Sequence, residues 1–142
     1  MKLHLTPGDG LQLFSGYGTD YVAVNNVRYE KCVVVTPQAV MEWTVGDFES
    51  LTAADFGFIA DLKPEIVIFG TGTAQRFPQP MLARALADSG AGVEVMDSKA
   101  ACRTYNILAS EGRKVAAAVL LGKWTSASAR TAINLPGPVA PS

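Results

Sequence analysis

The sequence has little of what a metal site requires. Its 142 residues include one histidine, His4, and two cysteines, Cys32 and Cys102, which lie far apart and form no C-x-x-C motif. A structural zinc site needs about four closely grouped His or Cys ligands. We therefore expect no bound metal. The two cysteines leave a disulfide open, and we favour reduced thiols in a cytoplasmic protein.

The sequence also lacks an excess of basic charge and long apolar runs. It holds 12 Lys or Arg and 13 Asp or Glu residues, without a basic block. A nucleic-acid partner needs a basic stripe that competes for phosphates. The longest apolar run, residues 115–121, is far shorter than the ~20 residues of a membrane-spanning helix. The N-terminus carries no apolar core of signal-peptide length. We expect no nucleic-acid partner, no membrane span and a cytoplasmic location.

Composition and length favour one compact domain. Hydrophobic residues make up 49% and charged residues 18% of the chain, as in ordinary globular proteins. A chain of this length can bury a substantial core. After Trp124 the apolar pattern decays into small polar and then proline-rich sequence. We predict a single α/β domain over residues 1–125 and a mobile tail over residues 126–142.

The N-terminal third has the pattern of β-strands. Residues 11–15 alternate weakly, and the β-rich runs 21–24 and 27–35 are separated by Asn25 and Asn26. Asparagine tolerates the positive φ of a tight turn, so the two runs are predicted to form a hairpin. Residues 40–45 alternate as well and are a further candidate strand.

A helix is predicted over residues 52–62. Thr52 suits the N-cap position, and Asp55 in the first turn suits the positive end of the helix dipole. Pro64 follows the predicted end of the helix. We expect one side of this helix to pack through Leu51, Phe58, Ile59 and Leu62.

The C-terminal half alternates strands and helices. Strands are predicted over residues 66–69, 93–96 and 115–121, and helices over residues 80–89 and 97–111. Pro80 suits a first helical turn, and Gly90 and Gly112 suit helix ends. Strands that alternate with helices indicate a parallel sheet with right-handed crossovers. The continuous apolar run 115–121 is typical of a strand buried on both faces.

The loop after the first of these strands, Gly70-Thr-Gly-Thr-Ala-Gln75, invites comparison with the dinucleotide fingerprint G-x-G-x-x-G. Asp97 ends the next strand, where a ribose-binding acid is usual. However, Gln75 replaces the third glycine, and Arg76 and the residues after it delay the helix. Pyrophosphate therefore cannot sit on the helix N-terminus. We expect no nucleotide cofactor.

Two interpretations of this loop remain open. In one, Gly70 and Gly72 let backbone N–H groups face a ligand, and Thr71, Gln75 and Arg76 add donors for a carboxylate or phosphate. In the other, the glycines serve a tight turn, and Arg76 pairs with a nearby acid.

The helix over residues 97–111 also has two interpretations. One arc carries Ala100, Ala101, Thr104, Tyr105, Ile107 and Leu108, and the opposite arc carries Lys99, Arg103, Asn106 and Ser110, with Cys102 near the boundary. A packed face and a solvated face explain this pattern. Alternatively, Asp97, Cys102, Arg103 and Asn106 meet the glycine loop at the carboxyl edge of the sheet, where open α/β sheets bind ligands.

No catalytic residue is predicted. Cys102 lies early in its helix beside Arg103, which favours a lowered pKa. His4, the one imidazole, lies in a separate N-terminal segment, so we do not expect Cys–His hydrolysis. Cys102 is expected to be a small buried residue. The large aromatics are expected in the core or in an interface, which leaves a homodimer open; they are Trp43, Phe48, Phe56, Phe58 and Trp124.

Several segments together resemble one family, the domain of unknown function 498 family. They are Ile-Val-Ile-Phe-Gly-Thr-Gly at residues 66–72, Gln-Arg-Phe-Pro at 75–78, Gly-Val-Glu-Val-Met-Asp-Ser at 92–98, Ala-Ala-Cys-Arg-Thr-Tyr-Asn-Ile-Leu at 100–108 and Glu-Gly-Arg-Lys-Val-Ala-Ala-Ala at 111–118. The resemblance covers roughly residues 17–123. It implies a three-layer α/β fold with a mixed central sheet and an N-terminal β-hairpin portion. It also implies no known catalytic residues and no known cofactor.

The resemblance also bears on partners. A mitochondrial member of this family acts through partner proteins in the assembly of respiratory complex I. Because the N-terminus is neither Arg-rich nor amphipathic, the chain resembles a bacterial, cytoplasmic member. The resemblance thus implies a protein partner and transfers no binding residue.

Two functional hypotheses follow. The first is a non-enzymatic binding or assembly protein. The second is a small-molecule or anion-binding protein, or an enzyme, that uses the two segments at the sheet edge. Its candidate residues are Gly70, Thr71, Gly72, Gln75, Arg76, Asp97, Cys102, Arg103 and Asn106. The second hypothesis requires Arg76 and Arg103 to lie on one face of the sheet.

Overall fold

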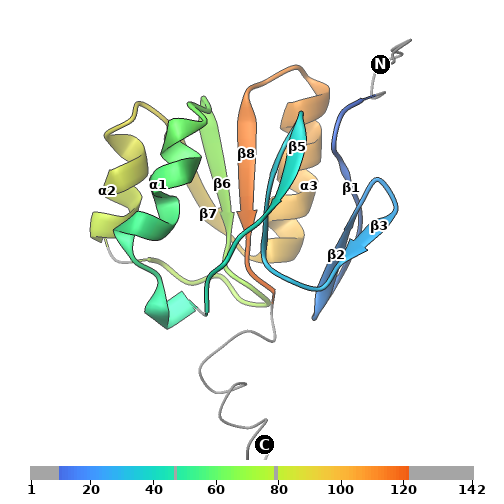
Figure 1. The fold of residues 1–142 in the computed structure, drawn as a ribbon, viewed down its shortest axis with the longest axis horizontal. Coiled ribbons are helices and arrows are strands. Elements are labelled where there is room, and N and C mark those ends of the chain that lie inside the picture. The colour runs from blue at the N-terminus through green and yellow to red at the C-terminus, as the bar shows by residue number, and fades with distance from the viewer. Residues whose placement is uncertain (1–9, 47, 79, 122–142) are drawn as a thin grey trace, which may run out of the picture.

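The computed structural model describes residues 10–46, 48–78 and 80–121, and its centre is a five-stranded mixed sheet (Figure 1). The strand order is β5-β4-β8-β6-β7. The strands β6, β8 and β7 run parallel, whereas β4 is antiparallel to β8 and β5 is antiparallel to β4. Their bounds are Val33–Thr36 for β4, Ala39–Glu42 for β5, Ile66–Gly70 for β6, Gly92–Met96 for β7 and Val115–Val119 for β8. The predicted α/β class and mixed sheet are confirmed.

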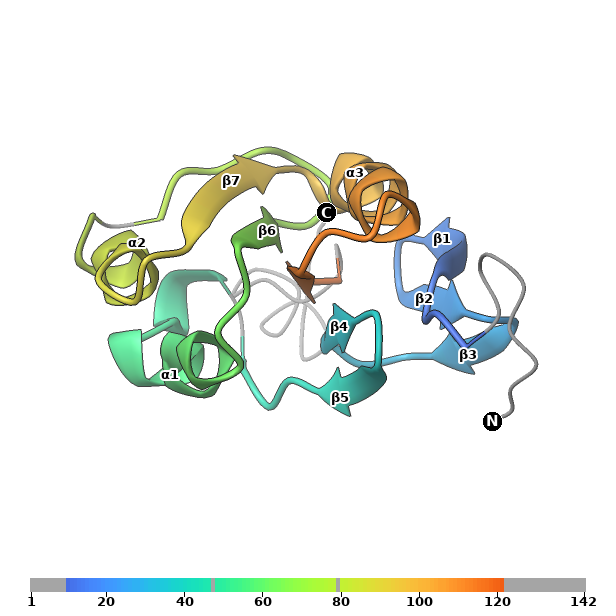
Figure 2. The same cartoon turned by 90° about the horizontal axis from the view of Figure 1, so that it is seen from above.

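Each face of this sheet is covered by a separate layer (Figure 2). The helices α1 (Ala53–Asp61) and α2 (Pro80–Ala87) lie against one face, with a short 3₁₀ helix, Phe48–Ser50. The helix α3 (Ser98–Ser110) and a three-stranded antiparallel sheet lie against the other face. The small sheet contains β1 (Phe14–Gly18), β2 (Tyr21–Val24) and β3 (Val27–Tyr29).

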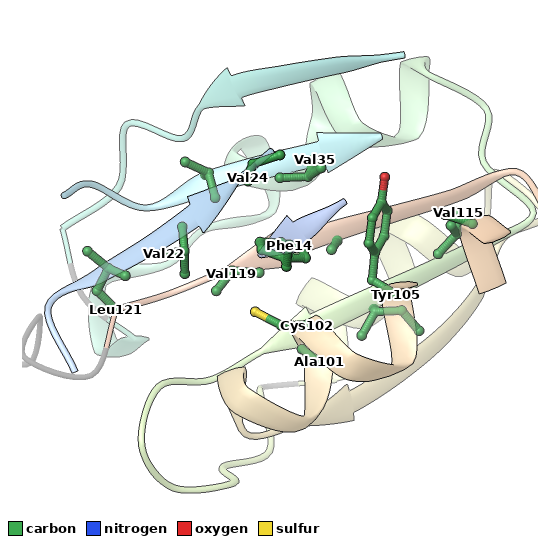
Figure 3. Packing of buried hydrophobic residues seen from close by; sticks show 14 residues of the cluster. Phe14, Val22, Val24, Val35, Ala101, Cys102, Tyr105, Val115, Val119 and Leu121 are labelled. Atoms are coloured by element: carbon green, nitrogen blue, oxygen red, sulfur yellow. The ribbon is translucent and has the colours of Figure 1, made fainter. Parts of the chain in front are cut away.

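The alternation of side chains along β8 produces two hydrophobic cores. Val115, Ala117 and Val119 pack toward α3 and the small sheet, and Figure 3 shows Cys102 and Tyr105 pointing from α3 into this cluster. Ala116 and Ala118 belong to the cluster on the α1 and α2 side. All of β8 is buried, as predicted for a strand covered on both faces.

The predicted hairpin is confirmed, with one correction. Asn25 and Asn26 have φ angles of 49° and 69°, and they join β2 to β3 with Val24 opposite Val27. The run 27–35 is not one strand, however. The chain leaves the small sheet after Tyr29 and enters the central sheet as β4, so Cys32 and Val33 lie in different cores.

The first helix begins as predicted but buries different residues. The Thr52 N–H donates to the Asp55 carboxylate at 2.8 Å, which satisfies a free amide at the start of α1. The predicted packing of Phe58 and Leu62 is wrong, because they are 37% and 40% exposed. Phe56 is buried instead, since its ring packs in T-shaped geometry against the Trp43 and Phe69 rings.

The predicted alternation of strands and helices in the C-terminal half is confirmed. Asp97 is the N-cap of α3, where its carboxylate accepts from the Ala100 N–H at 2.9 Å. Gly90 and Gly112 have φ angles of 94° and 83°, as helix-terminating glycines do. Trp124 and the predicted tail over residues 126–142 lie outside the described residues.

Candidate functional site

The glycine loop leaves the end of β6 in close contact with the start of α3. A Cβ added to Gly70 would lie 2.8 Å from Ser98 Oγ and 2.9 Å from Ser98 Cα. Such distances are too short for a real side chain. Gly70 therefore allows the strand end and the helix N-terminus to touch.

Ser98 joins three chain segments at this edge. Its hydroxyl donates to the Leu120 carbonyl at 2.6 Å and accepts from the Gly72 N–H at 2.8 Å. Its own N–H donates to the Gly72 carbonyl at 2.8 Å. Ser98 is fully buried, so each of these bonds replaces one that water would otherwise make. The loop, α3 and the end of β8 are thereby fixed to one another.

Several donors of the loop are already used inside the protein. The Thr71 N–H donates to the Met96 carbonyl at 2.9 Å, and the Arg76 N–H donates to the Thr71 hydroxyl at 3.1 Å. The Gln75 side chain donates to the Val95 carbonyl at 2.9 Å, on the edge strand β7. An anion-binding nest needs backbone and side-chain donors that point toward the ligand. Because these donors are bonded within the protein, few remain in the loop for an anion.

The Arg76 side chain lies on the side of the central sheet that α1 and α2 cover. Its guanidinium pairs with the Glu49 carboxylate at 3.1 Å and lies 4.8 Å from the centre of the Phe48 ring. Phe48 stacks on Phe69, which belongs to the core on that side. The structure thus contains the acid partner that the tight-turn interpretation expected for Arg76.

Cys102 lies in the opposite core. It is 5% exposed, and burial raises the pKa of its thiol to about 12, although Arg103 opposes this shift. A thiol that stays protonated near neutral pH is a poor nucleophile. The chemical character of Cys102 is therefore that of a small apolar residue.

Asn106 holds the edge of the small sheet. Its side-chain carbonyl accepts from the Phe14 N–H at 2.9 Å, and its side-chain amide donates to the Phe14 carbonyl at 2.8 Å. The Tyr105 hydroxyl donates to the Gln12 carbonyl at 2.7 Å. These three bonds fasten β1 and the residues just before it to α3.

The two predicted faces of α3 each have one exception. Asn106, on the arc predicted to face solvent, is half-buried. Ile107, on the arc predicted to pack, is 59% exposed.

A groove of about 270 Å³ lies between β1 and the first turns of α3. Gly16 and Tyr17 line it from β1, and Lys99, Arg103 and Asn106 line it from α3. The Tyr17 hydroxyl is buried, and no hydrogen-bond partner for it exists among the described residues. Burial raises the pKa of Tyr17, and the neighbouring Cys102 and Asp97 add to the shift.

The nine predicted site residues are therefore divided among three places. Gly70, Thr71, Gly72 and Asp97 meet at the carboxyl edge of the central sheet, where the glycine loop contacts α3, and Gln75 donates to β7 beside them. Arg76 lies on the side of α1 and α2. Cys102, Arg103 and Asn106 line the groove on the opposite side. Arg76 and Arg103 do not form one site.

Sequence reasoning missed two residues of this region. Ser98 was not among the predicted site residues, yet it joins the three segments at the sheet edge. Its position directly after Asp97 was the available signal. Tyr17 had no signal, because its neighbours in the groove are distant in sequence.

The described residues contain no group of three or more His, Cys, Asp or Glu side chains placed to hold a metal ion. Within the same residues, no helix is long and apolar enough to span a membrane.

Comparison with known proteins identifies relatives of most of the described region. The model of a family described as "Protein of unknown function (DUF498/DUF598)" matches residues 14–120. The bovine protein named NADH dehydrogenase [ubiquinone] 1 alpha subcomplex assembly factor 3 is 37% identical over 106 residues, covering 73% of this chain and 58% of the relative. The chain thus spans little more than half of that relative.

Two bacterial proteins match over most of their own length. A Francisella tularensis protein named 13 kDa major membrane protein is 28% identical over 109 residues, covering 75% of this chain and 89% of the relative. A Bordetella parapertussis crystal structure has a TM-score of 0.75 and 39% identity, covering 79% of this chain and 97% of that one. The predicted family resemblance and fold are confirmed.

Proposed function

The chain belongs to the family of proteins of unknown function DUF498/DUF598, and from this premise we propose that it is a protein-binding assembly factor of NADH dehydrogenase. The observation that supports this proposal most is the 37% identity to the bovine protein whose name states that role. Because the chain spans 58% of that relative, the shared part would carry the binding surface.

The surface offers a candidate contact for such a partner. Phe77 and Met81 are 77% and 63% exposed, and they lie in the loop before α2 and in its first turn. Arg76, next to Phe77, is held by Glu49 and Phe48. Phe, Met and Arg are enriched in protein interfaces. We assign the partner contact to this surface of Arg76, Phe77 and Met81.

Affinity capture from the cell that expresses the chain tests this function. Wild type is expected to enrich subunits of NADH dehydrogenase, and the double variant Phe77→Ala/Met81→Ala is expected to lose most of that enrichment. Ile107→Ala is a matched control, because Ile107 is also a large exposed apolar residue but lies on α3. Equal enrichment by the double variant would place the contact elsewhere. Absence of these subunits from every capture would refute the assembly role.

The cytoplasmic location and the homodimer also stay proposals. The name of the Francisella relative gives a membrane association as the competing location. Fractionation of native cells separates the two, because a cytoplasmic protein stays in the supernatant after high-speed centrifugation. For the homodimer, sedimentation at two concentrations should show a mass that rises with concentration, and a constant monomer mass would exclude it.

A further inference from the structure

The groove between β1 and α3 is lined by two cations, and neither of them forms an ion pair with a described residue. In a groove of about 180 Å³, one of the two lining cations, Arg113, pairs with Glu65 at 3.2 Å, and Lys114 has no ion pair among the described residues. Arg28 and Lys31 line another, and they pair with Glu30 and Glu42 at 2.9 Å. In the groove beside β1, neither Lys99 nor Arg103 has an ion-pair partner among the described residues.

Lys99 and Arg103 stand one helical turn apart on α3, and both are exposed. Like charges at this spacing repel each other and destabilise a helix. An anion between them would remove that repulsion. Their position in the first two turns of α3 adds the positive end of the helix dipole, although the Asp97 carboxylate at the N-cap offsets part of it.

The opposite wall of the groove supplies an unused polar group. Tyr17 lines the groove, and its buried hydroxyl lacks a partner in the described part of the chain. Buried polar groups in folded proteins nearly always have a hydrogen-bond partner. The hydroxyl has almost no exposed surface, so an acceptor oxygen in the groove would reach it only after the Tyr17 side chain turns toward the groove. The Asn106 pairing with Phe14 keeps the two walls at a fixed separation.

We propose that this groove is a binding site for a small oxyanion, a molecule that presents a carboxylate or phosphate group to Lys99 and Arg103. Its volume of about 270 Å³ is below the roughly 300–1,000 Å³ of pockets for drug-sized ligands and cofactors. This volume suits a small oxyanion. This site is separate from the surface of Arg76, Phe77 and Met81, and it stands whether or not the assembly role does.

Titration of the whole chain with sodium phosphate and with sodium succinate, followed by amide NMR, tests the proposal. At constant ionic strength, the amide signals of Gly16, Tyr17, Lys99 and Arg103 should shift and saturate with at least one of the two anions. The anion that saturates at the lower concentration identifies the group that the site prefers.

Variants make the assignment specific. Arg103→Gln and Lys99→Gln should each weaken binding about tenfold, which corresponds to one charge-assisted hydrogen bond. Arg84→Gln is the control, because Arg84 is an exposed cation on α2 and should leave binding unchanged. Groove signals that respond no more to either anion than to sodium chloride would overturn the proposal. Equal binding by the Arg103→Gln and Lys99→Gln variants would overturn it as well.

Discussion

The side chain of Asn106 pairs with both backbone polar groups of Phe14, at 2.9 Å to the N–H and 2.8 Å to the carbonyl. Phe14 belongs to β1, which is an edge strand of the small sheet. A free edge strand exposes unpaired backbone groups. Asn106 therefore acts at this position as a further strand would, and it attaches the N-terminal sheet to α3.

Asn106→Ala should destabilise the protein by roughly 2–4 kcal/mol, because it leaves two partly buried backbone groups without partners. Asn106→Asp should cost less, since a carboxylate can still accept from the Phe14 N–H. Chemical denaturation measures both effects. Ser110→Ala, at an exposed position of the same helix, is the control and should change stability by less than about 0.5 kcal/mol. If Asn106→Ala also lowered the free energy of unfolding by less than about 0.5 kcal/mol, Asn106 would not be what attaches β1 to α3.

Gly70→Ala should destabilise the protein by about 1–3 kcal/mol, because the new methyl group would meet Ser98 and Ala101 at 3.0 Å or less. Gly57→Ala provides a contrasting substitution. Gly57 lies inside α1, and a Cβ there would meet nothing within 4 Å. Alanine at this helical position should stabilise the protein by about 0.4–1 kcal/mol. Thermal unfolding of the two variants should therefore shift in opposite directions. A shift in the same direction would show that contact with Ser98 does not set the requirement for Gly70.

Tyr17→Phe should leave the stability of the free protein unchanged or raise it by about 1 kcal/mol, since it removes a buried hydroxyl that has no partner. The same variant should bind the groove's oxyanion more weakly than wild type. Denaturation and the anion titration measure the two effects. A marked loss of stability would show that the hydroxyl has a structural partner, and undiminished anion binding would remove it from the site.

The Cys102 thiol should make the free energy of unfolding decrease as the pH rises in the alkaline range. Burial raises its pKa from an ordinary value of 9.0 to about 12 in the folded protein. The unfolded chain therefore loses this proton first, and the contribution of the thiol to stability, complete below pH 9, declines as pH rises toward 12. Between about pH 8 and about pH 10 the loss should be about 1 kcal/mol.

The variant Cys102→Ala separates the contribution of the thiol from that of other groups that titrate at alkaline pH. Its stability should fall less between the two pH values than that of wild type, by about 1 kcal/mol. Denaturant titrations at both pH values give the difference. An identical pH dependence in the two proteins would show that the thiol is not protected by burial.

Local signals explain what the sequence could predict. Asn25 and Asn26 identified a hairpin, and Pro80, Gly90 and Gly112 identified helix ends, because each acts through its own backbone conformation. The alternation of strands and helices then predicted the parallel order of β6, β7 and β8. These features depend on neighbours within a few residues.

The parts that failed depend on contacts between distant residues. Whether Phe56 or Phe58 is buried is decided by Trp43 and Phe69, which the helical pattern does not contain. Asn106 on α3 bonds to Phe14 in the small sheet. Arg76 pairs with Glu49 on the side of the central sheet opposite to Arg103. The two predicted chain segments therefore meet at the sheet edge, but Arg76 and Arg103 lie on opposite sides of the central sheet.

The amount of assembled NADH dehydrogenase in cells that lack this chain tests the central claim most directly. We expect a loss of assembled complex on native gels and of NADH oxidation in isolated membranes. Wild type and the Ile107→Ala variant should restore both, and Phe77→Ala/Met81→Ala should not. Assembled complex at the normal level without the chain would contradict the assembly role.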